Sequence, residues 1–298
     1  MYMSIQEIVD AANNRQKPIY QLAIEQEMEI TKASYEEIWS KMEKNLVTME
    51  NAVKRSIEGN GVFSPTGLTG GDAVKIKKYR ENGKTLSGDW MMFGVQSAFG
   101  VNEVNSAMGV ICATPTAGAS GTIPGVLFSI KDTLQLSHEE TVHFLFTSAL
   151  FGMVVANNAC ISGAFGGCQA EVGSASAMAA AAAVEASGGT PQQSSEAFAT
   201  ALQNLLGLVC DPVAGLVEIP CVKRNAVGTA NALVAADIAL AGVTNVINAD
   251  ETIEAMYRVG KQMPRELRET GLGGIAATPT GIAIKNKIFG EKKDNKFI

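Results

Sequence analysis

The sequence predicts an all-α fold with few or no strands. Signals for helix ends recur along the chain, apolar residues return at three- and four-residue steps, and no segment alternates apolar and polar residues between hairpin turns. Residues 137–140 (SHEE) match a capping box, in which a serine begins the helix and a glutamate three residues later closes its first turn. Thr190-Pro191 begins another helix, with the threonine as cap and the proline at the first helical position.

Helices are predicted along most of the first third of the chain. Residues 1–15 form a charged amphipathic helix, and residues 18–33 and 35–57 place their apolar side chains at helical steps. Residues 63–89 are rich in glycine and basic side chains, which predicts a loop with a short helix. A helix interrupted by glycine is expected over 90–112.

Five further helices are predicted in the rest of the chain. One of them is rich in alanine, the strongest helix former, and glycines at 242 and 260 mark the ends of two others. The predicted segments are 137–151, 168–186, 190–207, 224–240 and 250–259.

The overall charge and the cysteine content exclude several classes of protein. A formal net charge of −6 argues against nucleic acid or an anionic membrane as the main partner. Five cysteines are an odd number for a disulfide framework, and residues 1–15 do not resemble a secretory leader. We therefore expect reduced thiols and a cytoplasmic location.

Charged residues are very unevenly distributed along the chain. Residues 90–222 contain only 10 of the 54 charged side chains, and the stretches 104–130 and 144–170 contain none. The first stretch is broken by prolines, and the second has too short an apolar run for the ~20 residues that span a bilayer. We expect no membrane segment, so the middle third must be buried against protein.

Three cysteines stand in unusual surroundings for ordinary buried residues. Cys168 follows two glycines at the start of a predicted helix, where the helix dipole favours a thiolate. Cys210 and Cys221 flank a loop that its prolines keep from being helical. Thiolates that converge in an apolar pocket can hold an iron–sulfur cluster, and three ligands would leave one iron open to a substrate.

The same residues allow other interpretations. Cys112 and Cys160 lie among small residues, where a cysteine is usually a small buried hydrophobe. Zinc is a competing metal, but a structural zinc site takes four tetrahedral ligands. The two histidines, His138 and His143, lie five residues apart on one predicted helix, which strains a zinc site.

A short motif occurs twice. Residues 113–118 (ATPTAG) recur near the end of the chain as residues 277–281 (ATPTG). Turns of this kind offer hydroxyl groups and backbone N–H groups that can bind a carboxylate. We expect the second copy to be a tight connection between helices.

Four segments together resemble one protein family. They are GCQAEVGSA, CDPVAGLVEIPCVKRNA, MPRELRETGLGGIAATPTG and, upstream, CATPTAGASGTIPG. The chain resembles the α chain of bacterial iron–sulfur-dependent L-serine dehydratases, also called L-serine ammonia-lyases, over essentially its whole length.

The resemblance implies a cofactor and a domain organisation. It implies a [4Fe–4S] cluster whose three cysteine ligands map onto Cys168, Cys210 and Cys221. It also implies one all-α domain over 1–298, with amphipathic N-terminal helices over 1–60 and a cluster-binding catalytic region over 61–298.

Partners are implied as well. Single-chain members of the family have a β-type domain with a Ser-Ser-Ser-His-Thr-like motif, and nothing similar occurs here. The resemblance therefore implies a separate serine dehydratase β subunit, in a heterodimer or a higher αβ oligomer. The implied substrate is L-serine, in amino-acid catabolism and gluconeogenesis.

The implied reaction turns L-serine into pyruvate and ammonia. An open iron would act as a Lewis acid on the hydroxyl group, which is a poor leaving group, and a base would remove the α-proton. Glu171 is the candidate base, since it lies one helical turn from Cys168. The alternatives are that Glu171 only bonds to helix N–H groups and that a histidine of the β subunit is the base.

The substrate carboxylate needs hydrogen-bond donors. The first ATPTAG segment and the residues just after Cys221 are the candidates, with a structural turn and a solvent-exposed arginine as the alternatives. The candidate substrate-binding residues are Thr114, Thr116, Gly118, Ser120, Arg224 and Asn225.

Three other functions remain possible from the sequence. A related cluster-dependent lyase would act on cysteine or a hydroxy acid. A pyridoxal-phosphate dehydratase would need a Schiff-base lysine and a phosphate-binding loop, and Lys223 has no such loop beside it. An electron-transfer protein would favour four protein thiolates around its cluster.

Overall fold

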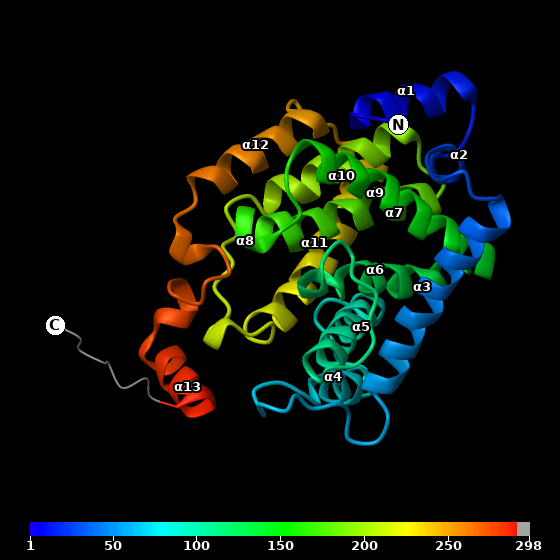
Figure 1. Cartoon of the computed structure of the whole chain (residues 1–298). Coiled ribbons are helices and arrows are strands. Elements are labelled where there is room, and N and C mark those ends of the chain that lie inside the picture. Colours follow the sequence, from blue (N-terminus) through cyan, green and yellow to red (C-terminus); the bar gives the residue numbers. More distant parts are fainter. Residues whose placement is uncertain (291–298) are drawn as a thin grey trace.

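The architecture is a bundle of α-helices, as predicted (Figure 1). The computed structural model describes residues 1–290, and in that range it contains no strand, only two isolated β-bridges. In chain order the helices are α1 (Ile5–Arg15), α2 (Ile19–Thr31), α3 (Tyr35–Ser56), α4 (Asp72–Glu81), α5 (Asp89–Ser106), α6 (Thr122–Thr133), α7 (His138–Asn158), α8 (Gly163–Gly166), α9 (Ser174–Ala186), α10 (Pro191–Asn204), α11 (Cys221–Leu240), α12 (Ala249–Gln262) and α13 (Pro279–Phe289).

Helix α9 lies inside the bundle and is enclosed by its neighbours (Figure 1). Every residue from 174 to 184 is buried. Most of these residues are alanines, whose short side chains let α7, α10 and α11 approach closely on different sides. The alanine-rich segment therefore forms a helix, as predicted, and that helix is the centre of the core.

The N-terminal helices belong to the same core as the rest of the chain. Ile5, Leu22 and Leu46 from α1, α2 and α3 lie in one hydrophobic cluster with Phe151 of α7 and Phe198 of α10. All five side chains are at most 1% exposed. Packing of this kind contributes ~2 kcal/mol or more for each fully buried large side chain.

The region of low charge is buried by this chain's own helices. Most residues of α6, α7 and α9 are buried, and they pack against one another and against α5, α10 and α11. Within residues 1–290 no helix combines the length and the hydropathy that crossing a bilayer requires.

Several predicted helices have different ends in the structure. The helix predicted over 137–151 extends to Asn158. The helix predicted over 90–112 ends at Ser106, because Met108 adopts a left-handed conformation with φ of 59° and Gly109 N–H bonds back to the carbonyl of Val104. Cys112 is therefore not helical. The helix predicted from Arg224 begins three residues earlier, at Cys221.

Three helices were not predicted. One is the single turn α8 that precedes Cys168. Helix α6 contains Pro124, which the sequence suggested as a break. This proline is the third helical residue, where no hydrogen bond within the helix is lost. Helix α13 begins in the second ATPTG copy, where the Thr278 hydroxyl accepts a hydrogen bond from Gly281 N–H and Pro279 is the first helical residue.

The segment between α12 and α13, residues 264–278, forms what we term the C-terminal strap. It runs beside the loop that contains Cys210. Cys210 N–H donates to the carbonyl of Leu267 at 2.8 Å, and Glu269 N–H donates to the carbonyl of Cys210 at 2.7 Å. These backbone bonds hold a segment distant in sequence against the cysteine loop.

Glu103 on α5 is a buried carboxylate that holds the start of α4. It is 1% exposed and accepts hydrogen bonds from the N–H groups of Asp72, at 2.6 Å, and Ala73. Burial raises the pKa of Glu103 to about 7, although the two N–H groups and Lys75 oppose the shift; the carboxylate of Asp72 adds to it.

Glu103 should make the protein less stable as the pH rises. Because its pKa is raised on folding, the folded state binds more protons than the unfolded state between about pH 4.5 and 7. The free energy of unfolding contributed by this group therefore falls across that window. In Glu103→Gln this fall should be smaller by about 3 kcal/mol, as measured by urea denaturation at several pH values. An unchanged fall, or an equal effect of the exposed control Glu58→Gln, would contradict the prediction.

Candidate metal centre

The three predicted cysteine ligands stand at the ends of helical segments. Cys168 joins α8 to a π-helical turn, Gln169–Gly173, that continues into α9. Cys210 lies on the loop after α10, and Cys221 is the first residue of α11. Their exposed fractions are 1%, 2% and 6%. π-Helical turns are rare and occur often at functional sites.

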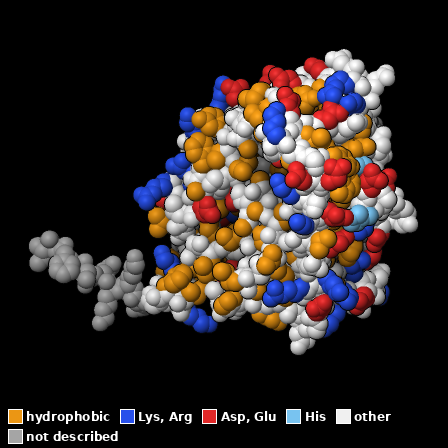
Figure 2. All heavy atoms as spheres, turned by 45° about the vertical axis from the view of Figure 1, so that its right-hand side comes forward, with side chains coloured by type: hydrophobic (Ala, Val, Ile, Leu, Met, Phe, Trp, Pro, Cys, Tyr) orange, Lys and Arg blue, Asp and Glu red, His pale blue; other side chains and the backbone are white. Residues whose placement is uncertain are grey.

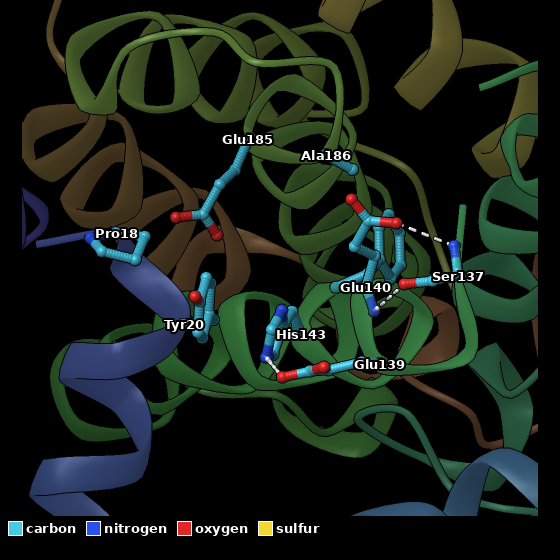
Figure 3. A pocket seen from close by; sticks show the side chains of 9 residues that line it. Pro18, Tyr20, Ser137, Glu139, Glu140, His143, Glu185 and Ala186 are labelled. Carbon is cyan, nitrogen blue, oxygen red and sulfur yellow. Dashed lines mark hydrogen bonds and ion pairs between the residues drawn. The ribbon is translucent and has the colours of Figure 1, made fainter. Parts of the chain in front are cut away.

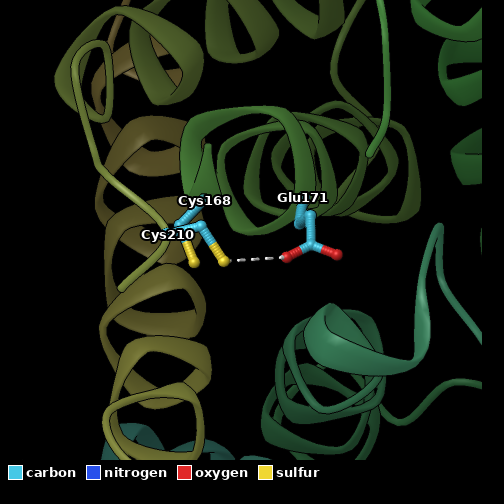
Figure 4. Close-up of side chains that lie close together, drawn as sticks. All are labelled: Cys168, Glu171 and Cys210. Atoms are coloured by element: carbon cyan, nitrogen blue, oxygen red, sulfur yellow. Dashed lines mark hydrogen bonds between the residues drawn. The ribbon is translucent and has the colours of Figure 1, made fainter. Parts of the chain in front are cut away.

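The side chains of Cys168, Cys210 and Glu171 converge (Figure 4). One sulfur from each cysteine and one carboxylate oxygen all lie within 4.8 Å of one another, and Cys210 Sγ is 4.0 Å from Glu171 Oε2. Cys221 lies outside this tight group, but it is close enough for the charge of Cys168 to affect its pKa. Ligands of a multinuclear cluster need not touch, because each binds a different metal atom.

The ionisation of the three thiols differs because of their neighbours. The Cys210 thiol, and then the guanidinium of Arg224, hold the pKa of the Cys168 thiol below its usual value. Contact with Cys168 and burial raise the pKa of Cys210, and burial raises that of Cys221. Cys168 is therefore the thiol that ionises first, and binding a metal at the other two would release protons.

Glu171 belongs to the π-helical turn and is buried beside the cysteines. Its Oε1 accepts a hydrogen bond from the Thr116 hydroxyl at 2.7 Å, and its other oxygen faces Cys210. Burial raises the pKa of Glu171, Thr116 opposes the shift, and the charge of Glu269 adds to it. Two residues that the sequence named separately are thus in direct contact.

Asn225 fastens α11 to the segment after the first ATPTAG motif. Its side-chain N–H donates to the carbonyl of Gly118 at 2.7 Å, and its Oδ1 accepts from Gly121 N–H at 3.0 Å and Thr122 N–H at 3.1 Å. Because Asn225 is fully buried, its bonds fix the position of Gly118, whose Cα faces the Glu171 carboxylate.

Arg224 is held by three contacts with the protein. Nη1 donates to the carbonyl of Val209 at 2.7 Å and lies 3.6 Å from Cys168 Sγ, while Nη2 lies 2.8 Å from Asp211 Oδ1. The carboxylate of Asp211 also accepts from Ile275 N–H on the C-terminal strap, at 2.7 Å. The guanidinium of Arg224, which the sequence named as a candidate donor to the substrate carboxylate, thus contacts the sulfur of Cys168 from a fixed position.

The donors in this centre fit a thiolate-bound metal group. Thr114 Oγ1 and Ser120 Oγ, two of the predicted substrate-binding hydroxyls, are buried and have no hydrogen-bond partner among the described residues. Gly163 lies against the centre, and its lack of a side chain keeps the space beside Glu171 and Cys210 open. A Cβ at this position would lie 2.7 Å from Glu171 Oε2 and 3.1 Å from Cys210 Sγ. Soft thiolates, a carboxylate oxygen that faces the thiols and unsatisfied hydroxyls are what a metal and a polar ligand would use.

The two histidines lie elsewhere. In a separate hollow, the ring of His143 stacks on Tyr20 at 3.6 Å between centroids, beside Glu139 and Glu185 (Figure 3). His138 pairs with Glu43. The surface view shows histidines among acidic side chains (Figure 2). Neither histidine is therefore near the cysteines.

Three features of the centre were not predicted from the sequence. They are Asp211, Gly163 and the C-terminal strap. The available signals were the position of Asp211 directly after Cys210 and the family segment MPRELRETGLGGIAATPTG, which contains the strap. The partners of Asp211 lie 13 and 64 residues further along the chain. Only the folded chain reveals such contacts.

The helical fold and this thiol-and-carboxylate centre define a protein with a candidate metal-dependent active site. The family model described as serine dehydratase alpha chain matches residues 14–276. The chain therefore belongs to the serine dehydratase alpha chain family, as its cysteine motifs indicated, and this family is one of enzymes.

Known relatives include both separate α chains and longer single chains. The probable L-serine dehydratase alpha chain of Bacillus subtilis is 58% identical, and the match covers 97% of this chain and 96% of the relative. The L-serine dehydratase alpha chain of Peptoniphilus asaccharolyticus is 40% identical, with 98% and 99% covered. The L-serine dehydratase of Mycobacterium tuberculosis is 36% identical over 92% of this chain, but the match covers only 61% of that longer protein.

A methyl group at position 163 should weaken metal binding without unfolding the protein. In Gly163→Ala the new Cβ presses on Glu171 and Cys210, so the affinity of the metal-free chain for Co²⁺ should fall about tenfold or more. The measurement is a titration of the thiolate-to-cobalt absorption band. Gly166→Ala on the same helix, whose Cβ would meet only Ala170, is the matched control. Equal Co²⁺ affinities in the two variants would contradict this account of the centre.

Proposed function

We propose that this chain is the α subunit of an L-serine dehydratase, which deaminates L-serine to pyruvate and ammonia. The observation that supports this function most directly is the convergence of buried Cys168, Cys210 and Glu171, with Cys221 nearby. All four residues lie within residues 14–276, the part of the chain that the family model matches. We also propose that residues 1–298 act as one catalytic domain.

The proposed cofactor is a [4Fe–4S] cluster held by Cys168, Cys210 and Cys221. When bound, it would supply an open iron as Lewis acid for the serine hydroxyl group. Three buried thiols at the ends of different helical segments support this ligand set. The low charge around them would strengthen electrostatic interactions at the site, because a low dielectric screens charge weakly.

Glu171 is the proposed base for the α-proton of serine. The Thr116 hydroxyl holds Oε1, which leaves Oε2 on the cysteine side of the carboxylate to receive the proton. Loss of the α-proton and of the β-hydroxyl group gives aminoacrylate. This product tautomerises to an imine, and water hydrolyses the imine to pyruvate and ammonia.

The proposed binding site for the serine carboxylate is the segment 114–120 with its support on α11. Thr114 and Ser120 offer buried hydroxyls without other partners among the described residues, and Thr116 and Gly118 lie beside Glu171. Asn225 on α11 supports the segment, because its side-chain N–H donates a hydrogen bond to the carbonyl of Gly118. Arg224, the remaining candidate, contacts the sulfur of Cys168.

A separate β subunit is the proposed partner, in a cytoplasmic αβ oligomer. The longer single-chain relatives support this arrangement, since about two-fifths of their length lies outside the match with this chain. The relatives that match this chain over almost their whole length are named alpha chains, which implies a second kind of chain.

The pyridoxal-phosphate alternative finds less support. Lys223, its candidate Schiff-base lysine, has an exposed side chain on α11, whereas such a lysine works in an enclosed pocket. A cluster-dependent lyase for cysteine or a hydroxy acid would use the same centre. Assays of serine, threonine and cysteine side by side distinguish these substrates.

Single cysteine substitutions test the ligand set. Cys168→Ala, Cys210→Ala and Cys221→Ala should each lose bound iron and serine deamination together, because each would remove one of three ligands. Cys112→Ala and Cys160→Ala should retain both. Iron and sulfide are measured after anaerobic purification. Loss of iron in Cys160→Ala would show that the proposed ligands are wrong.

Substitution of Glu171 separates catalysis from cofactor binding. Glu171→Gln keeps an acceptor for the Thr116 hydroxyl but cannot take a proton, so kcat should fall by about 10²–10⁴-fold while bound iron stays at the wild-type level. Thr116→Val should lower kcat by less. The measurement is pyruvate formation per iron-loaded chain. Wild-type kcat in Glu171→Gln would assign the proton transfer to another group, such as one on the β subunit.

A further inference from the structure

We infer that Arg224 is a positioning residue for the cluster ligand Cys168, and that Asp211 and the C-terminal strap hold it there. This inference rests on the proposed cluster and deepens it. It gives Arg224 a different role from binding the serine carboxylate. The guanidinium of Arg224 contacts the sulfur of Cys168 and is itself held by the Val209 carbonyl and by Asp211.

The geometry of Arg224 is that of a fixed cation. Its side chain is 14% exposed and that of Asp211 is 3% exposed. Nη1 is shared between the Val209 carbonyl and Cys168 Sγ, and Nη2 pairs with Asp211. A guanidinium has its donors in a rigid plane, so engaging two nitrogens sets the orientation of the whole group. Among the described residues, Arg224 is the cation in contact with a cysteine sulfur.

The C-terminal strap fixes Asp211 in turn. Ile275 N–H donates to Asp211 Oδ2 at 2.7 Å. The preceding residue, Gly274, has φ of 57°, and a Cβ there would lie 2.2 Å from the same oxygen. Only glycine allows the strap to approach Asp211 this closely. A continuous set of contacts therefore runs from the strap through Asp211 and Arg224 to Cys168.

A fixed cation at this position has a definite electrostatic effect. A cluster with three thiolate ligands has a net negative charge, which grows by one electron on reduction. Burial makes such charge costly unless a cation lies close. Hydrogen bonds to ligand sulfurs and nearby positive charge raise the reduction potential of iron–sulfur clusters. Arg224 should therefore raise the potential and slow the loss of iron.

The test is the midpoint potential of the cluster, measured without serine on the anaerobically purified full-length protein with its partner. Arg224→Gln should shift the potential to a lower value and speed iron loss to a chelator severalfold. Arg224→Lys keeps a charge but not the planar donors, so its shift should be smaller. Arg265→Gln removes one positive charge from an exposed position on the strap and should leave the potential unchanged.

A double-mutant comparison tests the part played by Asp211. In the Asp211→Asn background the guanidinium loses its ion pair and is held only through the Val209 carbonyl, so Arg224→Gln should shift the potential by less than it does in the wild type. Full additivity of the two shifts would overturn the role of Asp211. If Arg224→Gln cannot retain iron, the same comparison uses Arg224→Lys.

Two results would overturn the inference while leaving the proposed function intact. One is an iron-loaded Arg224 variant with a wild-type potential and a wild-type rate of iron loss. The other is such a variant with only a raised KM for serine, which would make Arg224 a substrate ligand. By contrast, wild-type protein without iron or sulfide would contradict the proposed cluster itself.

Discussion

Close packing around α9 is the constraint on which the candidate centre depends. The alanines of this helix let α7, α10 and α11 approach its axis. The π-helical turn that contains Glu171 is continuous with α9, and α11 begins at Cys221. A larger side chain in the middle of α9 would separate these helices, and the residues at their ends would separate with them.

The low charge of the interior decides how the centre can ionise. Burial raises the pKa of Glu171 and Cys221, whereas Cys168 lies beside Arg224 and has a lowered pKa. A metal group would replace protons as the source of positive charge at the other thiols. Because Arg224 contacts the sulfur of Cys168, this thiol has different electrostatic surroundings from the thiols of Cys210 and Cys221.

The contacts of the centre lie within the part of the chain that the family model matches. The match covers residues 14–276. The contacts extend from segment 114–122 to the strap, where Ile275 meets Asp211. The chain from segment 114–122 to the strap therefore acts as one structural unit, in which the strap supports the cysteine loop and α11 supports the segment beside Glu171.

The sequence by itself determined the all-α class and most helices, and it named the cysteines and the glutamate of the candidate centre. Helical periodicity, caps and cysteines beside glycine or proline are local signals, which need no knowledge of distant contacts. The tertiary structure alone decided that Thr116 bonds to Glu171, that Arg224 lies against Cys168 and that Asp211 joins Arg224 to the strap. Those pairs are separated by 13 to 64 residues, and only the packing of whole helices brings them together.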